Sequence, residues 1–198
     1  MKLLFGVLSP EMDKNGFTCG VSALDTYLQK LASQDMKRGF ATAIVARAET
    51  APNKIIGYYT LSAASVLLNN VPEEMARKMS RYPNIPAIRL GRLTVSSGIQ
   101  GQHVGSLMVL DALRRSCRNE LAWAIFLADA QRESEAIFYE KFLFQRFQEN
   151  TLTLWMLRRQ AEKLKEPLNY SQNKSAPYPK RQKPLWERHV KSFSYREK

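Results

Sequence analysis

A short apolar stretch at residues 88–95 constrains the fold more than any other part of this 198-residue chain. Its apolar residues alternate as in a β-strand and then slip by one position; they are Ile88, Leu90, Leu93 and Val95. In a regular strand, such a slip would turn the core-facing side chains outward. An extra residue at positions 91–92, a β-bulge, restores the phase, and bulges occur preferentially beside active sites. We therefore expect a bulged strand next to a functional site.

The segments around this strand alternate between helical and strand-like patterns. Apolar residues at helical spacing predict a helix over residues 22–35, and β-rich runs around turn residues predict a hairpin. In chain order we expect strands at 1–8, 40–46 and 55–64 with a turn at 51–54, a long connection at 67–87 with a short helix from residue 71, the strand at 88–95, a helix at 105–118, a buried strand at 122–128, a helix at 132–142, a strand at 151–157 and a basic helix at 158–165. This order predicts a mixed α/β fold with helices packed on a central sheet.

The composition excludes several classes of protein. With only two cysteines and two histidines, the chain lacks the residues for a disulfide framework or a zinc module, and we expect no metal. No apolar run approaches the roughly 20 residues that span a bilayer. We therefore expect a cytoplasmic protein without a membrane partner.

Positive charge is concentrated near the C-terminus. The chain has 30 Lys and Arg against 18 Asp and Glu, a net charge of +12, and residues 151–198 hold 12 of the basic and 4 of the acidic residues. Such a segment favours a polyanionic partner, most often nucleic acid, although a solvated tail that aids solubility has the same composition. Four prolines and few aliphatic residues predict a flexible tail at 166–198 behind a folded domain at 1–165.

The bulged strand leads into a glycine-containing loop and then into a helix. Backbone N–H groups at the start of such a helix point outward at the positive end of its dipole, which suits a pyrophosphate. An ordinary helix-start turn has the same sequence pattern, so the loop alone leaves both interpretations open. The candidate cofactor-binding residues are Leu93, Thr94, Val95, Gln100, Gly101, Gln102, His103, Val104, Gly105 and Ser106.

This loop, together with the Phe-Tyr-Glu segment at residues 138–140, resembles the acetyl-CoA site of the Gcn5-related N-acetyltransferase family. Residues 17–35, 57–62 and 86–93 are also similar to the toxin acetyltransferases of bacterial type II toxin–antitoxin pairs, and the resemblance covers roughly residues 5–157. It implies the acyl-CoA N-acyltransferase fold, of class α/β (α+β): a central mixed sheet with a bulged, splayed strand and helices on both faces.

The resemblance also implies a function. Such a toxin moves acetyl from acetyl-CoA to the α-amino group of aminoacyl-tRNA, most commonly glycyl-tRNA, and so blocks translation. The implied partners are aminoacyl-tRNA, a ribbon-helix-helix antitoxin and a second copy of the chain.

The resemblance assigns the catalytic role to Tyr139. When a neutral amine attacks the thioester, a phenol with a pKa of about 10 can donate a hydrogen bond or a proton to the departing CoA sulfur, whose thiol has a pKa of about 8.5. Without the resemblance, a tyrosine between Phe138 and Phe142 would be interpreted as core packing with a polar tip.

The acceptor side lacks an obvious base, because residues 55–64 and 88–95 contain no Asp or Glu. A lysine amine with a pKa of about 10.4 needs a base, whereas an α-amine with a pKa of about 7.7–8.0 is already partly neutral, so an α-amine acceptor is favoured. We expect tRNA contacts from Arg89, Arg92, Arg114, Arg115 and Arg118, with further basic candidates at Arg77, Lys78, Arg81, Lys141 and Arg146. Each of them, taken singly, also fits a solvated surface charge.

Two positions depart from the family pattern. His103 replaces the middle glycine of the loop, where its side chain would crowd the pyrophosphate, require a positive φ or, if protonated, hold phosphate. Leu143 replaces the glycine after the Phe-Tyr-Glu segment and is expected to strain that turn. Two alternatives therefore stay open: an acetyltransferase for a protein or small-molecule amine, and a catalytically weakened member that acts by binding RNA or antitoxin.

Overall fold

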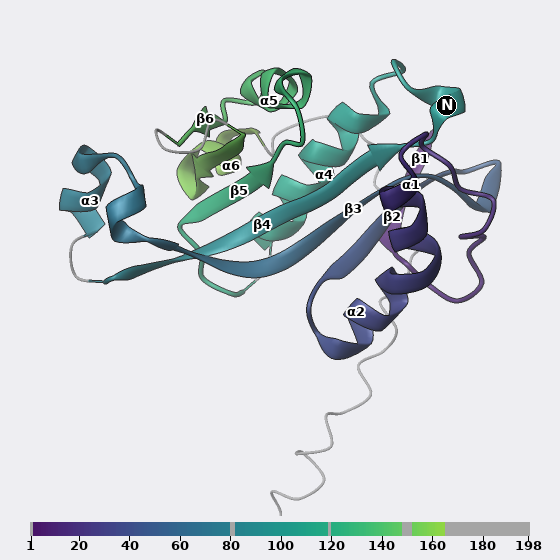
Figure 1. Cartoon of the computed structure of the whole chain (residues 1–198), viewed down its shortest axis with the longest axis horizontal. Helices are drawn as coiled ribbons and strands as arrows, with labels where there is room; N and C mark the ends of the chain where they lie inside the picture. The colour runs from purple at the N-terminus through teal and green to yellow at the C-terminus, as the bar shows by residue number, and fades with distance from the viewer. Residues whose placement is uncertain (1, 80–81, 119, 148–151, 165–198) are drawn as a thin grey trace, which may run out of the picture. The chain divides into compact units, whose positions relative to one another are not determined.

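The computed structural model describes residues 2–79, 82–118, 120–147 and 152–164 (Figure 1). The expected tail at 166–198 and the basic candidate Arg81 lie outside these residues. The strands are β1 (Leu3–Val7), β2 (Thr42–Ala48), β3 (Ala51–Leu67), β4 (Asn84–Val95), β5 (Ile125–Asp129), β6 (Gln145–Arg146) and β7 (Thr153–Leu157). The helices are α1 (Ser22–Thr26), the π-helical η1 (Tyr27–Leu31), α2 (Ala32–Arg38), α3 (Glu73–Met79), α4 (Val104–Arg118), α5 (Glu133–Glu140) and α6 (Arg158–Leu164), with 3₁₀ turns η2 (Leu68–Asn70) and η3 (Ser97–Ile99).

The strands of the described residues form one sheet in the order β1-β2-β3-β4-β5-β7-β6. Only the β4–β5 pair is parallel; the other recorded pairs are antiparallel. The expected mixed α/β fold is therefore confirmed, and the short strand β6 is an addition that sequence patterning did not predict.

The expected bulge lies where the apolar alternation slips. Tyr58 pairs with Thr94, and Thr60 pairs with Gly91, so one residue of β3 faces two residues of β4 between these pairs. The extra residue gives Arg92 a φ of 48°, in the left-handed region. Leu90 before the bulge is fully buried, as the alternation requires.

Strands β4 and β5 separate at the bulge. Their parallel pairing runs from Ala87–Ile125 to Leu90–Ala128 and then stops. Beyond Leu90, β4 continues to Val95 paired with β3 alone. The expected splayed strand is thus present, and the backbone edge of β4 that faces away from β3 borders the gap.

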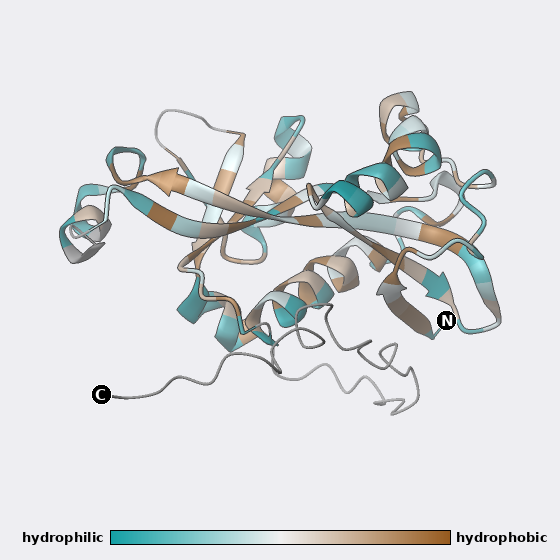
Figure 2. Ribbon diagram, turned by 90° about the horizontal axis from the view of Figure 1, so that it is seen from below, coloured by the Kyte–Doolittle hydropathy of each residue, from teal (hydrophilic) through white to brown (hydrophobic). Residues whose placement is uncertain are grey.

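Helices cover both faces of the sheet, as two neighbouring tyrosines of β3 demonstrate. The hydroxyl of Tyr58 donates to Leu24 O of α1 at 2.8 Å, whereas the hydroxyl of Tyr59 donates to Asp111 Oδ2 of α4 at 2.7 Å. Because successive side chains of a strand point to opposite faces, α1 and α4 lie on opposite sides of the sheet. Figures 1 and 2 show this layered arrangement of helices around the strands.

The expected turn at residues 51–54 is wrong. These residues begin β3, and the connection from β2 consists of residues 49–50. Pro52 is tolerated in the strand because β4 ends opposite Gly57, so this end of β3 has no β4 partner. An isolated parallel bridge from Asp13 to Lys54 lies beside it. Arg47 Nη1 also donates to Pro52 O at 2.6 Å. Strand β3 ends at Leu67 and β4 begins at Asn84, so the connection between them is shorter than the expected 67–87.

Candidate active site

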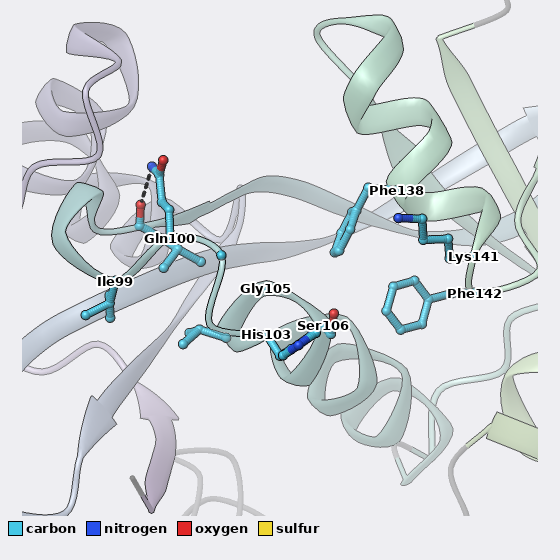
Figure 3. Close-up of a pocket in the computed structure, with 11 residues that line it drawn as sticks. Ile99, Gln100, His103, Gly105, Ser106, Phe138, Lys141 and Phe142 are labelled. Atoms are coloured by element: carbon cyan, nitrogen blue, oxygen red, sulfur yellow. Dashed lines mark hydrogen bonds between the residues drawn. The ribbon is translucent and has the colours of Figure 1, made fainter.

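A cleft of about 430 Å³ opens between the start of α4 and the end of α5 (Figure 3). It is lined by Val95, Ile99, Gln100, Gly101, His103, Val104, Gly105, Ser106, Phe138, Lys141 and Phe142. The structure thus brings seven of the ten expected cofactor-binding residues together. The other three do not line the cleft: Leu93 and Thr94 belong to β4 beside it, and Gln102 is exposed in the loop.

The first turn of α4 presents backbone donors to the cleft. Leu107 N donates to His103 O at 3.1 Å, so the helix's hydrogen bonding begins at His103. The N–H groups of the next three residues, 104–106, therefore have no acceptor within the helix. Because these residues line the cleft, their N–H groups and the helix dipole suit a phosphate-bearing ligand.

Gln100 has a structural role in the loop. Its Nε2 donates to Val95 O at 3.0 Å, shown dashed in Figure 3, and to Cys19 O at 3.1 Å. The side chain ties the loop to the end of β4 and to the segment before α1. Gln100 therefore holds the shape of the loop, while the backbone is left to meet a ligand.

The opposite wall comes from α5 and the turn that follows it. Phe138, Lys141 and Phe142 line this wall, and a β-carbon built on Gly105 would lie 3.6 Å from Phe138 Cζ. The sequence suggested Lys141 as a tRNA contact and did not identify either phenylalanine as a residue of the cleft. Their spacing of three and four residues, which puts side chains on one helical face, was the available signal.

Tyr139 is a buried residue of α5 next to Phe138 and is not among the residues that line the cleft. The residue is 5% exposed. The centroid of its ring lies 5.4 Å from that of Phe138 and 5.5 Å from that of Phe144. Burial raises the pKa of the Tyr139 phenol well above its usual value, and the nearby carboxylates of Glu135 and Asp129 raise it further. The hydroxyl therefore stays protonated at physiological pH, as a general acid requires.

Comparisons with known proteins agree with this geometry, although no family model matches the chain. The tRNA-acetylating toxin of Mycobacterium tuberculosis is 28% identical over 159 residues, which cover 79% of this chain and 93% of that toxin. AtaT in complex with acetyl-methionyl-tRNAfMet matches with a TM-score of 0.75 at 26% identity, over 82% of this chain and 99% of AtaT. A tyrosine-to-phenylalanine mutant of KacT matches with a TM-score of 0.75 at 25% identity, over 83% of this chain and 99% of KacT. The chain is therefore similar to a tRNA-acetylating toxin over about four fifths of its length and shares the fold of AtaT and KacT.

Both departures from the family pattern have a left-handed backbone. His103 has a φ of 60° and Leu143 a φ of 66°. The expected positive φ at His103 and the expected strain at Leu143 are therefore present, since side chains other than Gly, Asn and Asp rarely occupy this region. His103 is exposed at the edge of the cleft that it lines.

Two of the five arginines expected to contact tRNA form ion pairs within the described structure. Arg89 forms an ion pair with Asp129, across the point where β4 and β5 separate. Arg115 pairs with Asp111 at 2.7 Å and also donates to Phe5 O at 3.1 Å. These pairs join strands and helices, so their first role is in the fold.

The other basic candidates are distributed over several surfaces. Arg92 is exposed and lies over the ring of Tyr27, while Arg114 is half-buried and Arg118 exposed on α4. Arg77 pairs with Glu73 on α3. Arg146 pairs with both Glu133 and Glu140, at 2.5 and 2.6 Å, and so holds the two ends of α5.

We expect Arg115→Met to lower the free energy of unfolding by about 1.5–3 kcal/mol, because the largely buried Asp111 loses a charge-assisted hydrogen bond. Urea unfolding measures the change. Arg114→Met is the matched control, with an expected change below about 0.5 kcal/mol. Equal losses in the two variants would contradict a structural role for the Arg115–Asp111 pair.

Neither a metal cluster nor a membrane-spanning helix is found in the part of the chain that the structure describes. Those residues contain no group of three or more His, Cys, Asp and Glu that could hold a metal ion. None of their helices is long and apolar enough to cross a bilayer.

Proposed function

We propose that this protein transfers the acetyl group of acetyl-CoA to the α-amino group of aminoacyl-tRNA, and so blocks translation in the cytoplasm as the toxin of a toxin–antitoxin pair. One observation carries the proposal: the glycine-containing loop at the start of α4 and the α5 segment around Tyr139 enclose one cleft beside the splayed end of β4. AtaTR has been solved with acetyl-CoA bound, and AtaT with acetyl-methionyl-tRNAfMet.

The cleft suits the phosphates and the pantetheine chain of acetyl-CoA. The N–H groups of residues 104–106 and the ammonium of Lys141 supply positive potential for the phosphates. Phe138 and Phe142 supply an apolar surface on the opposite wall. Among the described strands, β4 pairs with β3 alone beyond Leu90, and its other edge offers backbone hydrogen-bonding groups at the gap, up to Val95 O, which accepts from Gln100.

Tyr139 acts as the general acid in the proposed reaction. The lone pair of the neutral amine forms a bond to the thioester carbon, and collapse of the tetrahedral intermediate breaks the C–S bond. Tyr139 donates its proton to the departing sulfur and regains one from the amine nitrogen or from solvent. Burial keeps the phenol protonated until that step, because it raises the pKa of Tyr139.

The absence of a carboxylate on the central strands favours an α-amine as acceptor. Strands β3 and β4, with their full extents at residues 51–67 and 84–95, contain no Asp or Glu. An α-amine with a pKa of about 7.7–8.0 supplies enough neutral nucleophile at physiological pH without a base. Glycyl-tRNA is the acceptor that we propose first. Methionyl-tRNA is the first competitor to test, because AtaT has been solved with acetyl-methionyl-tRNAfMet.

The proposed partners follow from the same role. A ribbon-helix-helix antitoxin would neutralise the toxin, and two copies of the chain would form a homodimer. A structure of AtaT with the C-terminus of the antitoxin AtaR exists. Co-expression with a neighbouring ribbon-helix-helix gene, if present, tests the first partner, and sedimentation tests the second.

A transfer assay with labelled acetyl-CoA over charged total tRNA tests the function. Label should appear on aminoacyl-tRNA, and nuclease digestion followed by identification of the acetylated aminoacyl-adenosine names the amino acid. Uncharged tRNA is the control and should stay unlabelled. Labelling of protein or of small amines alone would favour the broader N-acetyltransferase instead.

A catalytically weakened member is the second candidate function. The observation that favours it is His103 at a φ of 60° in the loop, together with Leu143 at 66° in the turn after α5. Such a protein would act by binding RNA or antitoxin. Calorimetry with acetyl-CoA distinguishes the two candidates, because only the acetyltransferase must bind it.

We expect His103→Gly to bind acetyl-CoA as tightly as the wild type or up to about tenfold more tightly, a gain of up to ~1.4 kcal/mol. Glycine adopts the positive φ without strain and removes the imidazole from the cleft. Calorimetric titration measures the affinity. Weaker binding would show instead that the imidazole is a phosphate ligand.

A further inference from the structure

Arg92 is held in place by an aromatic stack. Its guanidinium carbon lies 3.8 Å from the centroid of the Tyr27 ring. The hydroxyl of Tyr27 donates to Asp35 Oδ2 at 2.9 Å, and its ring stacks on that of Tyr58 at 6.3 Å. Burial, and then the hydrogen bond to Asp35, raises the pKa of Tyr27 to about 12, so it remains a neutral donor. The ring is therefore a fixed platform for the arginine.

The backbone of Arg92 is strained at the bulge of β4. Its φ of 48° places a long side chain in the left-handed region, at the bulge of β4. Strained residues persist where the surrounding structure holds them and are concentrated at functional sites. Glycine would suit this backbone without strain, so the conformation of the bulge does not by itself require an arginine here.

The charge of Arg92 is directed at solvent. The side chain is exposed. Within the described ranges, no carboxylate forms an ion pair with Arg92, in contrast to Arg89 with Asp129 and Arg115 with Asp111. Arg92 therefore combines a fixed position with an unneutralised charge, which is a property of anion-binding arginines.

Arg92 lies across the sheet from the cleft. Tyr27 and Tyr58 lie on the α1 face, whereas the cleft begins at α4 on the other face. Arg92 is nevertheless adjacent to Leu93, at the splayed end of β4 where the acetyl group would be transferred. An acceptor that approaches this point from the α1 face, outside the donor's cleft, meets the guanidinium first.

We propose that Arg92, stacked on Tyr27, binds a phosphodiester near the 3′ end of the acceptor RNA and so places the aminoacyl group at the splayed end of β4. The inference rests on the proposed function and names the phosphate contact that this function needs. RNA phosphates are the anions that a planar, fixed guanidinium recognises through paired hydrogen bonds.

The experiment compares two acceptors, aminoacyl-tRNA and an aminoacyl-adenosine that carries the same amino acid but no phosphate. Arg92→Gly and Arg92→Asn suit the positive φ and remove the charge. Arg92→Lys keeps the charge but loses the planar fork. Arg159→Gln removes one charge from an exposed position on α6 and is the control.

We expect Arg92→Gly and Arg92→Asn to lower transfer to aminoacyl-tRNA by about 10- to 100-fold, the scale of a lost charge-assisted hydrogen bond. Transfer to aminoacyl-adenosine and the affinity for acetyl-CoA should match the wild type. Arg92→Lys should transfer acetyl to aminoacyl-tRNA at a rate between those of the wild type and of Arg92→Gly. Arg159→Gln should match the wild type on both acceptors. The salt slope of log K for tRNA should become shallower by about 0.7–0.9 in the glycine variant.

Equal losses on both acceptors, or no loss on either, would overturn the inference, because Arg92 would then act on the chemistry or not at all. If the wild type transfers acetyl to neither acceptor, the proposed function fails. The salt slope of tRNA binding still decides the inference in that case. An unchanged slope in Arg92→Gly rejects the phosphate contact, and a shallower one supports it.

Discussion

Tyr139→Phe should keep acetyl-CoA binding and lose about 10²–10⁴-fold of acetyl transfer, the usual contribution of a general acid. The change removes only the hydroxyl, so the packing of the ring on Phe138 and Phe144 is retained. Because the phenol is buried and its pKa is raised, the wild-type residue stays protonated across the physiological range. The fold-loss should therefore be the same from about pH 6 to pH 9.

Calorimetry and single-turnover transfer, measured on one preparation, separate binding from chemistry. Tyr82→Phe is the matched control, because Tyr82 is 67% exposed and lies away from the residues that line the cleft. It should behave as the wild type. If Tyr139→Phe transfers acetyl within a few-fold of the wild type, Tyr139 has no part in the mechanism and returns to the role of a packed core residue.

The affinity for tRNA should fall steeply with salt, by about 10³-fold or more between 50 and 200 mM if six or more phosphates are contacted. Truncation after Leu164 removes nine basic residues: Lys165, Lys174, Lys180, Arg181, Lys183, Arg188, Lys191, Arg196 and Lys198. The truncated chain should bind tRNA more weakly and with a shallower slope. The loss should be similar for all tRNA species, since phosphate contacts carry no sequence information.

Filter binding at a series of salt concentrations measures the slope, and calorimetry should find the affinity for acetyl-CoA unchanged. A full-length chain with the nine residues changed to glutamine separates charge from length and should match the truncated chain. An unchanged slope after truncation would assign the RNA contacts to the described part of the chain, around Arg92, Arg114 and Arg118.

Local patterns determined much of this protein in advance. The slip in the apolar alternation predicted the bulge before Leu93, because the two-residue period of a strand leaves no other way to keep both halves buried. The glycine-containing loop predicted the donors at the start of α4. At His103 the family pattern predicted a positive φ as one of several alternatives, and at Leu143 it predicted strain; both residues have a positive φ. In each case the deciding residues are neighbours in the sequence.

Only the tertiary structure decided which charges have partners. Arg89 meets Asp129 across 40 residues of sequence, and Arg115 meets Phe5 O across 110. Lys141, one of several basic candidates in the sequence, lines the cleft because the end of α5 faces the start of α4. Arg92 lies over Tyr27, 65 positions earlier in the chain, only because β4 and η1 are close in space. Composition specifies how many charges a chain carries, but pairing depends on distances of a few ångströms that packing of remote segments sets.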